Sequence, residues 1–207
     1  MRQVTSVEDR LPAAMTRVCV FAGSRAGARP SYQSAAETLG QVLAARGIEL
    51  VYGGGRVGLM GVLANAVLAS GGRVIGVIPQ ALATREIAHD GLTHLHVVTS
   101  MHERKALMAD LSGGFVALPG GWGTLEEFFE VLTWAQLGIH GKPCGLLNAD
   151  GYFDPLLVFL RHVIDEGFLR REYEAMISVS RDPDGLLDLM TAYRPPFTEK
   201  WLDESLT

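Results

Sequence analysis

Short apolar runs alternate with longer stretches of helical periodicity from Arg17 onward. The runs predict buried strands, because each is four or five residues long and is bounded by turn residues. The strands are expected at residues 18–21, 48–52, 74–78, 95–98, 115–118, 144–147 and 176–179. The periodic stretches predict helices at residues 32–46, 59–69, 103–111, 125–137, 155–166 and 184–192.

This alternation is typical of a parallel sheet with crossover helices. A closed barrel of eight such units usually needs ~250 residues, so seven strands in 207 residues favour an open, doubly wound, Rossmann-like α/β sheet. We expect a single catalytic domain over residues 17–195, after a disordered extension over 1–16 and before a tail over 196–207. Ligand sites in such sheets lie at the carboxyl ends of the strands.

Composition narrows the class of protein. Hydrophobic residues make up 48% of the chain and charged residues 20%, which indicates a soluble, ordered domain. The net charge of -5 argues against a broad nucleic-acid surface. No apolar run approaches the ~20 residues of a membrane helix, and residues 1–16 do not resemble a signal peptide, so we expect a cytoplasmic protein. Cys19 and Cys144 each lie in an apolar run and are expected to be buried, reduced thiols.

The stretch after residues 115–118 carries the strongest chemical signal. Pro119, Gly120 and Gly121 end the apolar run, and a helical pattern begins a few residues later. Glycines let backbone N–H groups approach an anion closely, and the N-terminus of the following helix adds its positive dipole end. The stretch therefore predicts a phosphate-binding turn between a strand and a helix.

Thr124 and Glu127 stand at the spacing of a capping box, in which each side chain bonds the backbone N–H of the other residue. Glu127 therefore has two candidate roles, a helix cap and a catalytic carboxylate. Spacing alone does not separate these roles, and the two are compatible.

Glycine-rich turns also follow the first two predicted strands, at residues 23–27 and 53–58. All three turns are expected to converge on one crevice, because the carboxyl ends of parallel strands share one edge of the sheet. Gly53, Gly55 and Gly58 match the dinucleotide fingerprint in spacing, but Gln80 stands near the place where such proteins carry an acidic residue. The missing carboxylate weakens an NAD interpretation and leaves a tight turn, packed closely on the sheet, as the alternative.

Other chemistries lack their usual motifs. No lysine follows the glycine pattern of a phosphate loop, and no Gly-x-Ser-x-Gly elbow occurs. His94 and His96 share a strand face near His102, but no carboxylate stands at a recurring ligand spacing, so no metal site is predicted.

Arg104 and Lys105 follow the predicted strand at 95–98 and are expected at the same sheet edge as the central turn. Arg104 offers a bidentate fork and Lys105 a point charge for a phosphate. Two cations near a helix N-terminus oppose the helix dipole, so a bound anion or a facing carboxylate such as Glu127 is expected beside them. In the alternative interpretation, both side chains are solvated.

Three segments resemble the signature segments of the LONELY GUY (LOG) family. They are residues 52–61 (Tyr-Gly-Gly-Gly-Arg-Val-Gly-Leu-Met-Gly), 101–105 (Met-His-Glu-Arg-Lys) and 119–127 (Pro-Gly-Gly-Trp-Gly-Thr-Leu-Glu-Glu). The resemblance runs from about Val18 to Val179. It implies a Rossmann-like fold, a homodimer, and hydrolysis of cytokinin riboside 5'-monophosphates without a cofactor. Members of this family are often labelled lysine decarboxylases.

The resemblance assigns the catalytic pair to Arg104 and Glu127. It assigns nucleotide contacts to Glu86, Lys105, Gly121, Trp122, Gly123, Thr124, Leu125, Glu126 and Thr133. The glycine turns add Gly120, Gly23, Ser24, Gly54 and Gly55 as expected substrate contacts. Two segments depart from the family pattern, Gly-Ser-Arg-Ala-Gly at 23–27 and Gly-Gly at 113–114. Both departures bear on how the base and the sugar are bound more than on the catalytic step.

The expected reaction cleaves the bond between N9 of an adenine and the ribose of its 5'-monophosphate. Glu127 would stabilise the positive charge that develops on the sugar and orient water, while the central turn holds the phosphate. The alternative is a carrier of a nucleotide-containing cofactor such as molybdopterin, although a carrier would not require Arg104 with Glu127. A pyridoxal-phosphate decarboxylase would need a Schiff-base lysine and a larger fold.

Overall fold

The computed structural model describes residues 15–83 and 88–196. Its strands are β1 (Arg17–Phe21), β2 (Glu49–Tyr52), β3 (Val74–Pro79), β4 (His94–Val98), β5 (Phe115–Ala117), β6 (Cys144–Leu147) and β7 (Ile177–Ser180). Its α-helices are α1 (Pro30–Ala45), α2 (Gly58–Ala69), α3 (Gln80–Ala83), α4 (Met101–Leu111), α5 (Trp122–Gln136), α6 (Asp154–Asp165) and α7 (Pro183–Ala192). Two 3₁₀ turns, η2 (Ala149–Gly151) and η3 (Arg171–Met176), flank α6.

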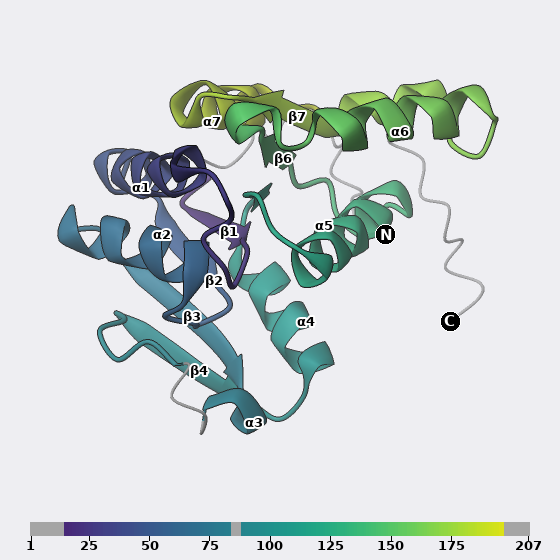
Figure 1. The fold of residues 1–207 in the computed structure, drawn as a ribbon. Coiled ribbons are helices and arrows are strands. Elements are labelled where there is room, and N and C mark those ends of the chain that lie inside the picture. Colours follow the sequence, from purple (N-terminus) through teal and green to yellow (C-terminus); the bar gives the residue numbers. More distant parts are fainter. Residues whose placement is uncertain (1–14, 84–87, 197–207) are drawn as a thin grey trace, which may run out of the picture.

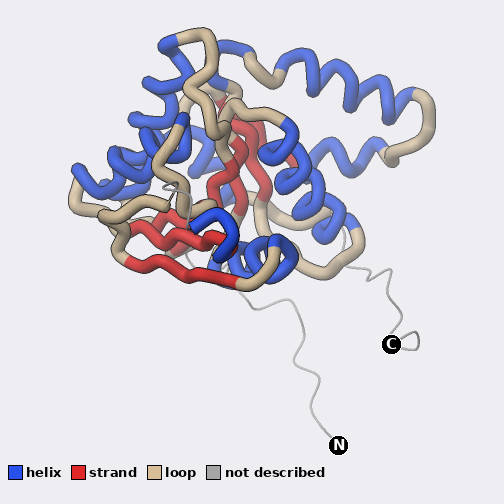
Figure 2. The backbone as a smooth tube through the Cα atoms, turned by 60° about the horizontal axis from the view of Figure 1, so that its bottom comes forward, coloured by secondary structure: helices blue, strands red, loops and turns tan. Residues whose placement is uncertain are grey.

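The strands form one parallel sheet in the order β4-β3-β2-β1-β5-β6-β7 (Figures 1 and 2). The chain builds outward from β1 to β4 on one side, then returns to the centre and continues from β5 to β7 on the other. The strand order therefore reverses between β1 and β5, which is where open α/β sheets bind ligands. All the predicted strands are present, and the predicted Rossmann-like α/β class is confirmed.

Helices cover both faces of the sheet because successive strand residues point to opposite sides. Val18 and Val20 face a core formed with α1, α2 and α7. Cys19 and Phe21 face a second core formed mainly with α4 and α5. Cys19 and Cys144 are buried and free, as expected, and both lie in register with Phe115 on the strand between them.

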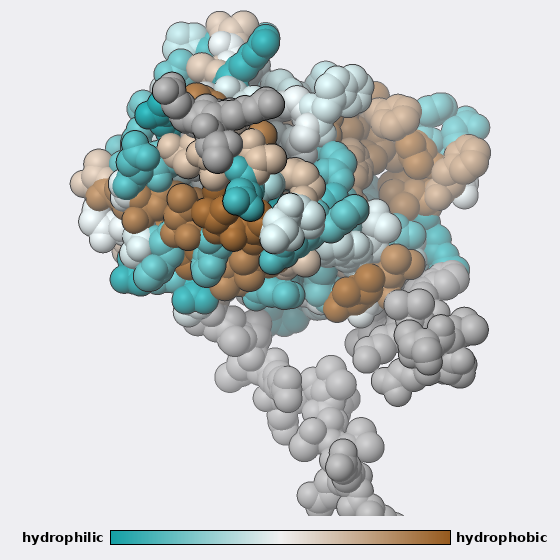
Figure 3. All heavy atoms as spheres, turned by 90° about the horizontal axis from the view of Figure 1, so that it is seen from below, coloured by the Kyte–Doolittle hydropathy of each residue, from teal (hydrophilic) through white to brown (hydrophobic). Residues whose placement is uncertain are grey.

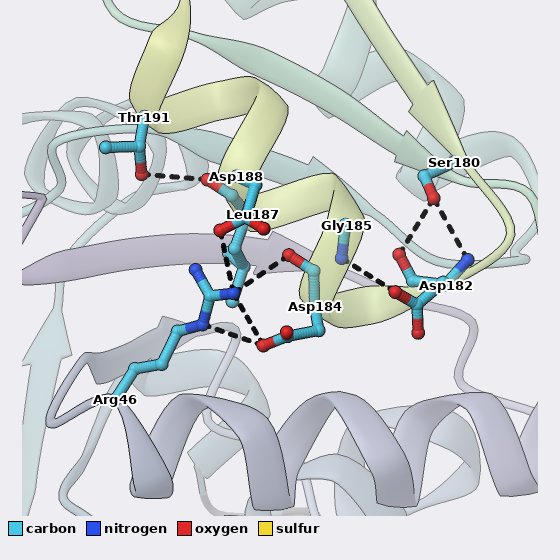
Figure 4. A network of polar contacts seen from close by, with 8 residues as sticks. All are labelled: Arg46, Ser180, Asp182, Asp184, Gly185, Leu187, Asp188 and Thr191. Carbon is cyan, nitrogen blue, oxygen red and sulfur yellow. Dashed lines mark hydrogen bonds and ion pairs between the residues drawn. The ribbon is translucent and has the colours of Figure 1, made fainter.

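Arg46 ties α1 to α7 on the first face (Figure 4). It follows the last residue of α1, and its guanidinium binds Asp184 at 2.5 Å and Asp188 at 2.8 Å. Asp182 caps the same helix, because its carboxylate accepts the N–H of Gly185 at 2.8 Å. The two helices are thus held together by charge as well as by the apolar core.

The outer strand β4 is the most exposed of the sheet. Leu95 and Val97 on this strand are exposed apolar residues. Figure 3 views the molecule from the side on which β4 and α3 lie, and apolar side chains gather there.

Several boundaries differ from the sequence-based expectation. The helices begin one to three residues earlier than predicted, and α3, η2 and η3 were not expected. The predicted extension reached residue 16, but Met15 packs against the core and the carbonyl of Thr16 accepts the N–H of Glu49 at 2.9 Å. These two residues therefore belong to the fold. The rest of the predicted extension, and the predicted tail beyond residue 196, lie outside the described residues.

Candidate active site

The glycine-rich turns after β1, β2 and β5 meet at the carboxyl end of the sheet, as predicted. The N–H of Gly23 donates to the carbonyl of Pro119 at 3.1 Å, and the N–H of Leu59 donates to the carbonyl of Gly23 at 3.0 Å. A Cβ at Gly58 would lie 2.2 Å from the backbone of Ser24. Only glycine at position 58 therefore lets the second turn pack against the first. The three turns therefore line the place where the strand order reverses.

The helix-cap role, one of the two that spacing left open for Glu127, is not observed at the start of α5. Within the described residues, Gly121 is the N-cap and makes no side-chain capping bond, and the helix begins at Trp122. Thr124 thus lies in the first turn of the helix, where its buried hydroxyl is folded back over Gly120. Gly121 has a φ of -98° and a ψ of -149°, and the helix starts without the side-chain cap that spacing suggested.

Open space surrounds two glycines of this turn. A Cβ at Gly121 or Gly123 would meet no atom of the described chain within 4 Å, and neither residue has the positive φ that favours glycine. Packing within the described chain therefore does not require glycine at either position. The first four N–H groups of an α-helix have no partner within the helix. Open space beside free N–H donors suits an anion that approaches the backbone closely.

Arg104 and Glu127 form a buried ion pair beside this turn. Nη1 of Arg104 donates to Oε1 of Glu127 at 2.5 Å, and Nε donates to the carbonyl of Val77 at 3.1 Å. A Cβ at Gly53 would lie 2.1 Å from Nη2 of Arg104. Glycine at this position therefore makes room for the guanidinium. Of the two partners expected for Arg104, a bound anion or a facing carboxylate, the structure shows the carboxylate of Glu127.

Burial raises the pKa of Glu127, and the charge and hydrogen bond of Arg104 only partly oppose that effect. Glu126 adds a smaller upward contribution to the same pKa. A carboxylate with a raised pKa in a crevice is typical of a group that handles protons or developing positive charge.

Lys105 is held by two carboxylates of α5. Its Nζ lies 2.6 Å from Oε1 of Glu126 and 3.0 Å from Oε1 of Glu130, and both contacts raise the pKa of the lysine. The lysine is therefore not the solvated residue of the alternative interpretation. Two cations and three carboxylates, counting Arg104 and Glu127, meet between α4 and α5.

The start of α4 explains how basic residues fit near a helix N-terminus. Ser100 caps the helix by accepting the N–H of Glu103 at 3.1 Å. The carboxylate of Glu103 in turn accepts the N–H of Thr99 at 2.8 Å. Favourable capping at the first turn thus offsets the unfavourable position of Arg104 and Lys105 relative to the dipole.

The structure describes only one of the two remaining nucleotide contacts implied by the resemblance. Glu86 lies outside the described residues. Thr133 stands nine residues beyond Thr124 on α5, which at 1.5 Å per residue is about 14 Å along the helix. Its hydroxyl donates to the carbonyl of Phe129 at 2.7 Å. It lines an apolar cavity of about 510 Å³ between α5, α6 and β7.

The second glycine turn holds its shape through its own packing. Gly54 has a φ of +74°, a Cβ there would lie 3.2 Å from Ile78, and its carbonyl accepts the N–H of His89 at 3.0 Å. Gly55 forms an antiparallel bridge with Ala88. Their expected role as substrate contacts therefore stays a prediction.

The sequence pattern missed one contact to the central turn. The hydroxyl of Tyr152, just before α6, donates to the carbonyl of Gly120 at 2.5 Å. Tyr152 and Gly120 are 32 residues apart and share no motif, so nothing in the local pattern indicated this bond.

Residues 15–83 and 88–196 contain no group of three or more His, Cys, Asp or Glu side chains placed to hold a metal ion. In the same described residues, no helix is long and apolar enough to cross a membrane.

Known proteins resemble this chain in sequence and in fold. The family model described as "Possible lysine decarboxylase" matches residues 60–190. A cytokinin riboside 5'-monophosphate phosphoribohydrolase of Rhodococcoides fascians is 53% identical over 171 residues, which are 82% of this chain and 86% of that protein. The Arabidopsis thaliana enzyme LOG7, of the same name, is 50% identical over 183 residues, covering 88% and 84% of the two chains.

Among solved structures, a molybdenum cofactor binding protein of Rippkaea orientalis superposes with a TM-score of 0.65. The superposition covers 86% of this chain and 96% of that one, at 22% sequence identity. At this identity the likeness concerns the fold alone. Sequence identity of about one half over most of both chains carries more weight, and this chain belongs to the LONELY GUY (LOG) family of cytokinin riboside 5'-monophosphate phosphoribohydrolases.

Proposed function

We propose that this protein hydrolyses the N-glycosidic bond of adenosine 5'-monophosphates, including N6-substituted ones. Water adds across the bond between N9 and the sugar, and the products are the free base and ribose 5-phosphate. The observation that carries the proposal is the buried pair of Arg104 and Glu127 beside an open glycine turn at the N-terminus of α5. The names of the relatives supply the substrate class.

The carboxylate of Glu127 suits the charge that this reaction develops. Cleavage of a glycosidic bond builds positive charge on the sugar ring, and a buried carboxylate stabilises that charge more strongly than water does. The same oxygen atoms orient the attacking water. Arg104 holds the carboxylate in place, since its guanidinium is itself fixed by the carbonyl of Val77 and by the close fit against Gly53.

The phosphate is bound mainly by backbone groups in this proposal. Carboxylates already neutralise Arg104 and Lys105, so neither offers a free charge to a substrate. The N–H groups of the turn from Gly120 to Thr124 and the dipole of α5 then provide the attraction. The phosphate is remote from the bond that breaks, and the free energy gained by binding it positions the sugar against Glu127.

The remaining parts of the proposal concern assembly and location. We take the protein to be a cytoplasmic homodimer that needs no cofactor, nucleic acid or membrane. Thr133, about 14 Å along α5 from the turn, is kept as a proposed nucleotide contact. Glu86, Ser24 and Trp122 complete the proposed contact set, and Trp122 is 91% exposed beside the turn.

The test is steady-state kinetics on adenosine, AMP and ATP and on their isopentenyl forms, with chromatography of the released bases. We expect the monophosphates to be cleaved far more efficiently than the nucleosides, whose missing phosphate leaves the N–H donors unused. Triphosphates should also be poor substrates. Equal efficiency on nucleoside and monophosphate would remove the phosphate role of the turn. Binding of nucleotide without release of base would favour a carrier instead.

A further inference from the structure

Tyr152 contacts the central turn from the loop between β6 and α6. It precedes α6, is 36% exposed, and its hydroxyl donates to the carbonyl of Gly120 at 2.5 Å. We propose that Tyr152 is a positioning residue that sets the orientation of the phosphate-binding turn. This inference rests on the proposed function, because it assumes that the turn binds the 5'-phosphate.

The geometry of the peptide group gives this hydrogen bond its effect. The carbonyl of Gly120 and the N–H of Gly121 belong to one planar trans peptide, so they point in opposite directions. A bond that holds the carbonyl toward Tyr152 therefore holds the N–H of Gly121 away from it. Gly121 is the N-cap of α5, and its N–H is one of the donors left free at the helix start.

The turn needs such a bond because its glycine residues leave the backbone flexible. Gly120 and Gly121 are consecutive, and glycine peptides rotate more freely than others. Thr124 already packs against the Cα of Gly120 on one side. Tyr152 supplies a second constraint, on the carbonyl, and the two together fix the plane of the peptide.

The ring of Tyr152 is itself fixed. It packs edge-on against Tyr32 of α1 at 5.6 Å and against Phe153 at 5.0 Å, measured between ring centroids. Both neighbours are buried. The hydroxyl is therefore presented to Gly120 from a rigid support.

The loop that carries Tyr152 is closed by a bond between its own ends and is tied to the start of α1. The side-chain oxygen of Asn148 accepts the N–H of Phe153 at 2.7 Å. Asp150, which has a φ of +51°, accepts from Arg29 at 2.9 Å and from Ser31 at 3.2 Å, at the start of α1. This loop thus links the start of α1 to the turn before α5, on the two sides of the point where the strand order reverses.

The variant Tyr152→Phe tests the inference, because it keeps the ring and removes the hydroxyl. Tyr32→Phe is the matched control: it removes the hydroxyl of the neighbouring ring, which makes no hydrogen bond to the turn. We expect kcat/KM for AMP to fall about three- to tenfold in Tyr152→Phe, the range of one hydrogen bond. The value for adenosine should stay within about twofold of wild type, because adenosine does not use the turn.

Product inhibition supplies a readout that does not depend on turnover of the nucleoside. In Tyr152→Phe, the inhibition constant of ribose 5-phosphate should rise by the same factor, while that of adenine should not change. Tyr32→Phe should leave both constants and the melting temperature at their wild-type values.

Equal losses on AMP and adenosine, or equal increases in both inhibition constants, would show a general structural role and overturn the inference. An unchanged preference for AMP in Tyr152→Phe would also overturn it, while leaving the proposed function intact. If wild-type enzyme itself cleaves adenosine as well as AMP, the proposed phosphate role fails instead. The two failures are therefore distinguishable.

Discussion

Arg104 donates to Glu127 across 2.5 Å, and each of the two side chains keeps only 11% of its surface exposed. Burying two charges costs solvation free energy, and such pairs often stabilise a fold no better than apolar residues would. A buried pair next to free N–H donors is therefore better explained by chemistry than by stability. That view leads to predictions for each partner.

Glu127→Gln keeps the size of the side chain and a hydrogen-bond acceptor but removes its charge. We expect kcat to fall at least about a hundredfold, the order of loss for one electrostatic group at a reacting centre. Circular dichroism should show an intact fold. Near-normal turnover would make Glu127 a structural partner of Arg104 only.

Arg104→Lys should not restore the activity that Arg104→Ala loses. The guanidinium bonds the carbonyl of Val77 and the carboxylate of Glu127 at the same time, and a lysine has a single point charge. Both variants should also lower the melting temperature, because Glu127 is left buried without its full complement of bonds. Turnover of the lysine variant at the wild-type rate would mean that charge alone suffices.

The pKa of Glu127 predicts how activity and stability change with pH. Because burial raises this pKa above its ordinary value of 4.5, kcat at saturating substrate should decline on acidification at a higher pH than an ordinary glutamate would cause. Glu126→Gln should move this decline to lower pH, since Glu126 raises the pKa of Glu127. Glu37→Gln on the other face of the sheet serves as the control.

The raised pKa of Glu127 also predicts the direction in which the unfolding free energy changes with pH. A group whose pKa is higher in the folded state stabilises the fold below its unfolded pKa, and this contribution is lost as pH rises through the folded pKa. The unfolding free energy of wild type relative to Glu127→Gln should therefore fall as pH increases from about 4 toward neutrality. A difference that grows with pH would show that Arg104 outweighs burial.

Gly53→Ala tests whether the second turn exists to accommodate Arg104. The new Cβ would lie 2.1 Å from Nη2, so the guanidinium must shift, and we expect its bond to Glu127 to be disturbed. We expect a loss of activity similar to that of Arg104→Ala, and a loss of about 1–3 kcal/mol in unfolding free energy. Gly113→Ala is the control, because Gly113 bonds Arg17 at the amino edge of the sheet, away from the turns, and its Cβ would meet nothing in the described chain closer than 3.5 Å.

Gly123→Ala should separate stability from activity. The added Cβ meets no described atom within 4 Å, and alanine favours the helix, so the unfolding free energy should rise by about 0.5 kcal/mol or stay unchanged. The same methyl group occupies the space proposed for the phosphate. We expect kcat/KM for AMP to fall at least about tenfold, with a smaller effect on adenosine. Unchanged kinetics would place the phosphate elsewhere.

The strand runs and the position of Arg104 with respect to Glu127 were predictable from the sequence. Short apolar runs indicate buried strands from local sequence alone. The carboxyl ends of parallel strands lie at one edge of the sheet, so the residues after β4 and β5 are expected close together. The dipole argument then favoured a bound anion or a facing carboxylate near Arg104, with Glu127 as the candidate. These inferences use short-range order and a general property of parallel sheets.

The capping box failed because its spacing has more than one structural meaning. Thr124 and Glu127 fit a cap, but the chain begins α5 at Trp122, which moves Thr124 onto Gly120 and frees Glu127 for Arg104. Which meaning applies depends on the partner that a neighbouring helix presents. Local spacing carries no information about that partner.

Only the tertiary structure decided the contacts that cross between elements distant in sequence. The fit of Gly53 against Arg104, the capture of Lys105 by Glu126 and Glu130, and the bond from Tyr152 to Gly120 all depend on how helices dock on the sheet. Docking is set by side-chain packing summed over both cores, and no single motif encodes it. The sequence by itself therefore determined the fold class and the chemical groups, while packing decided which of those groups face one another.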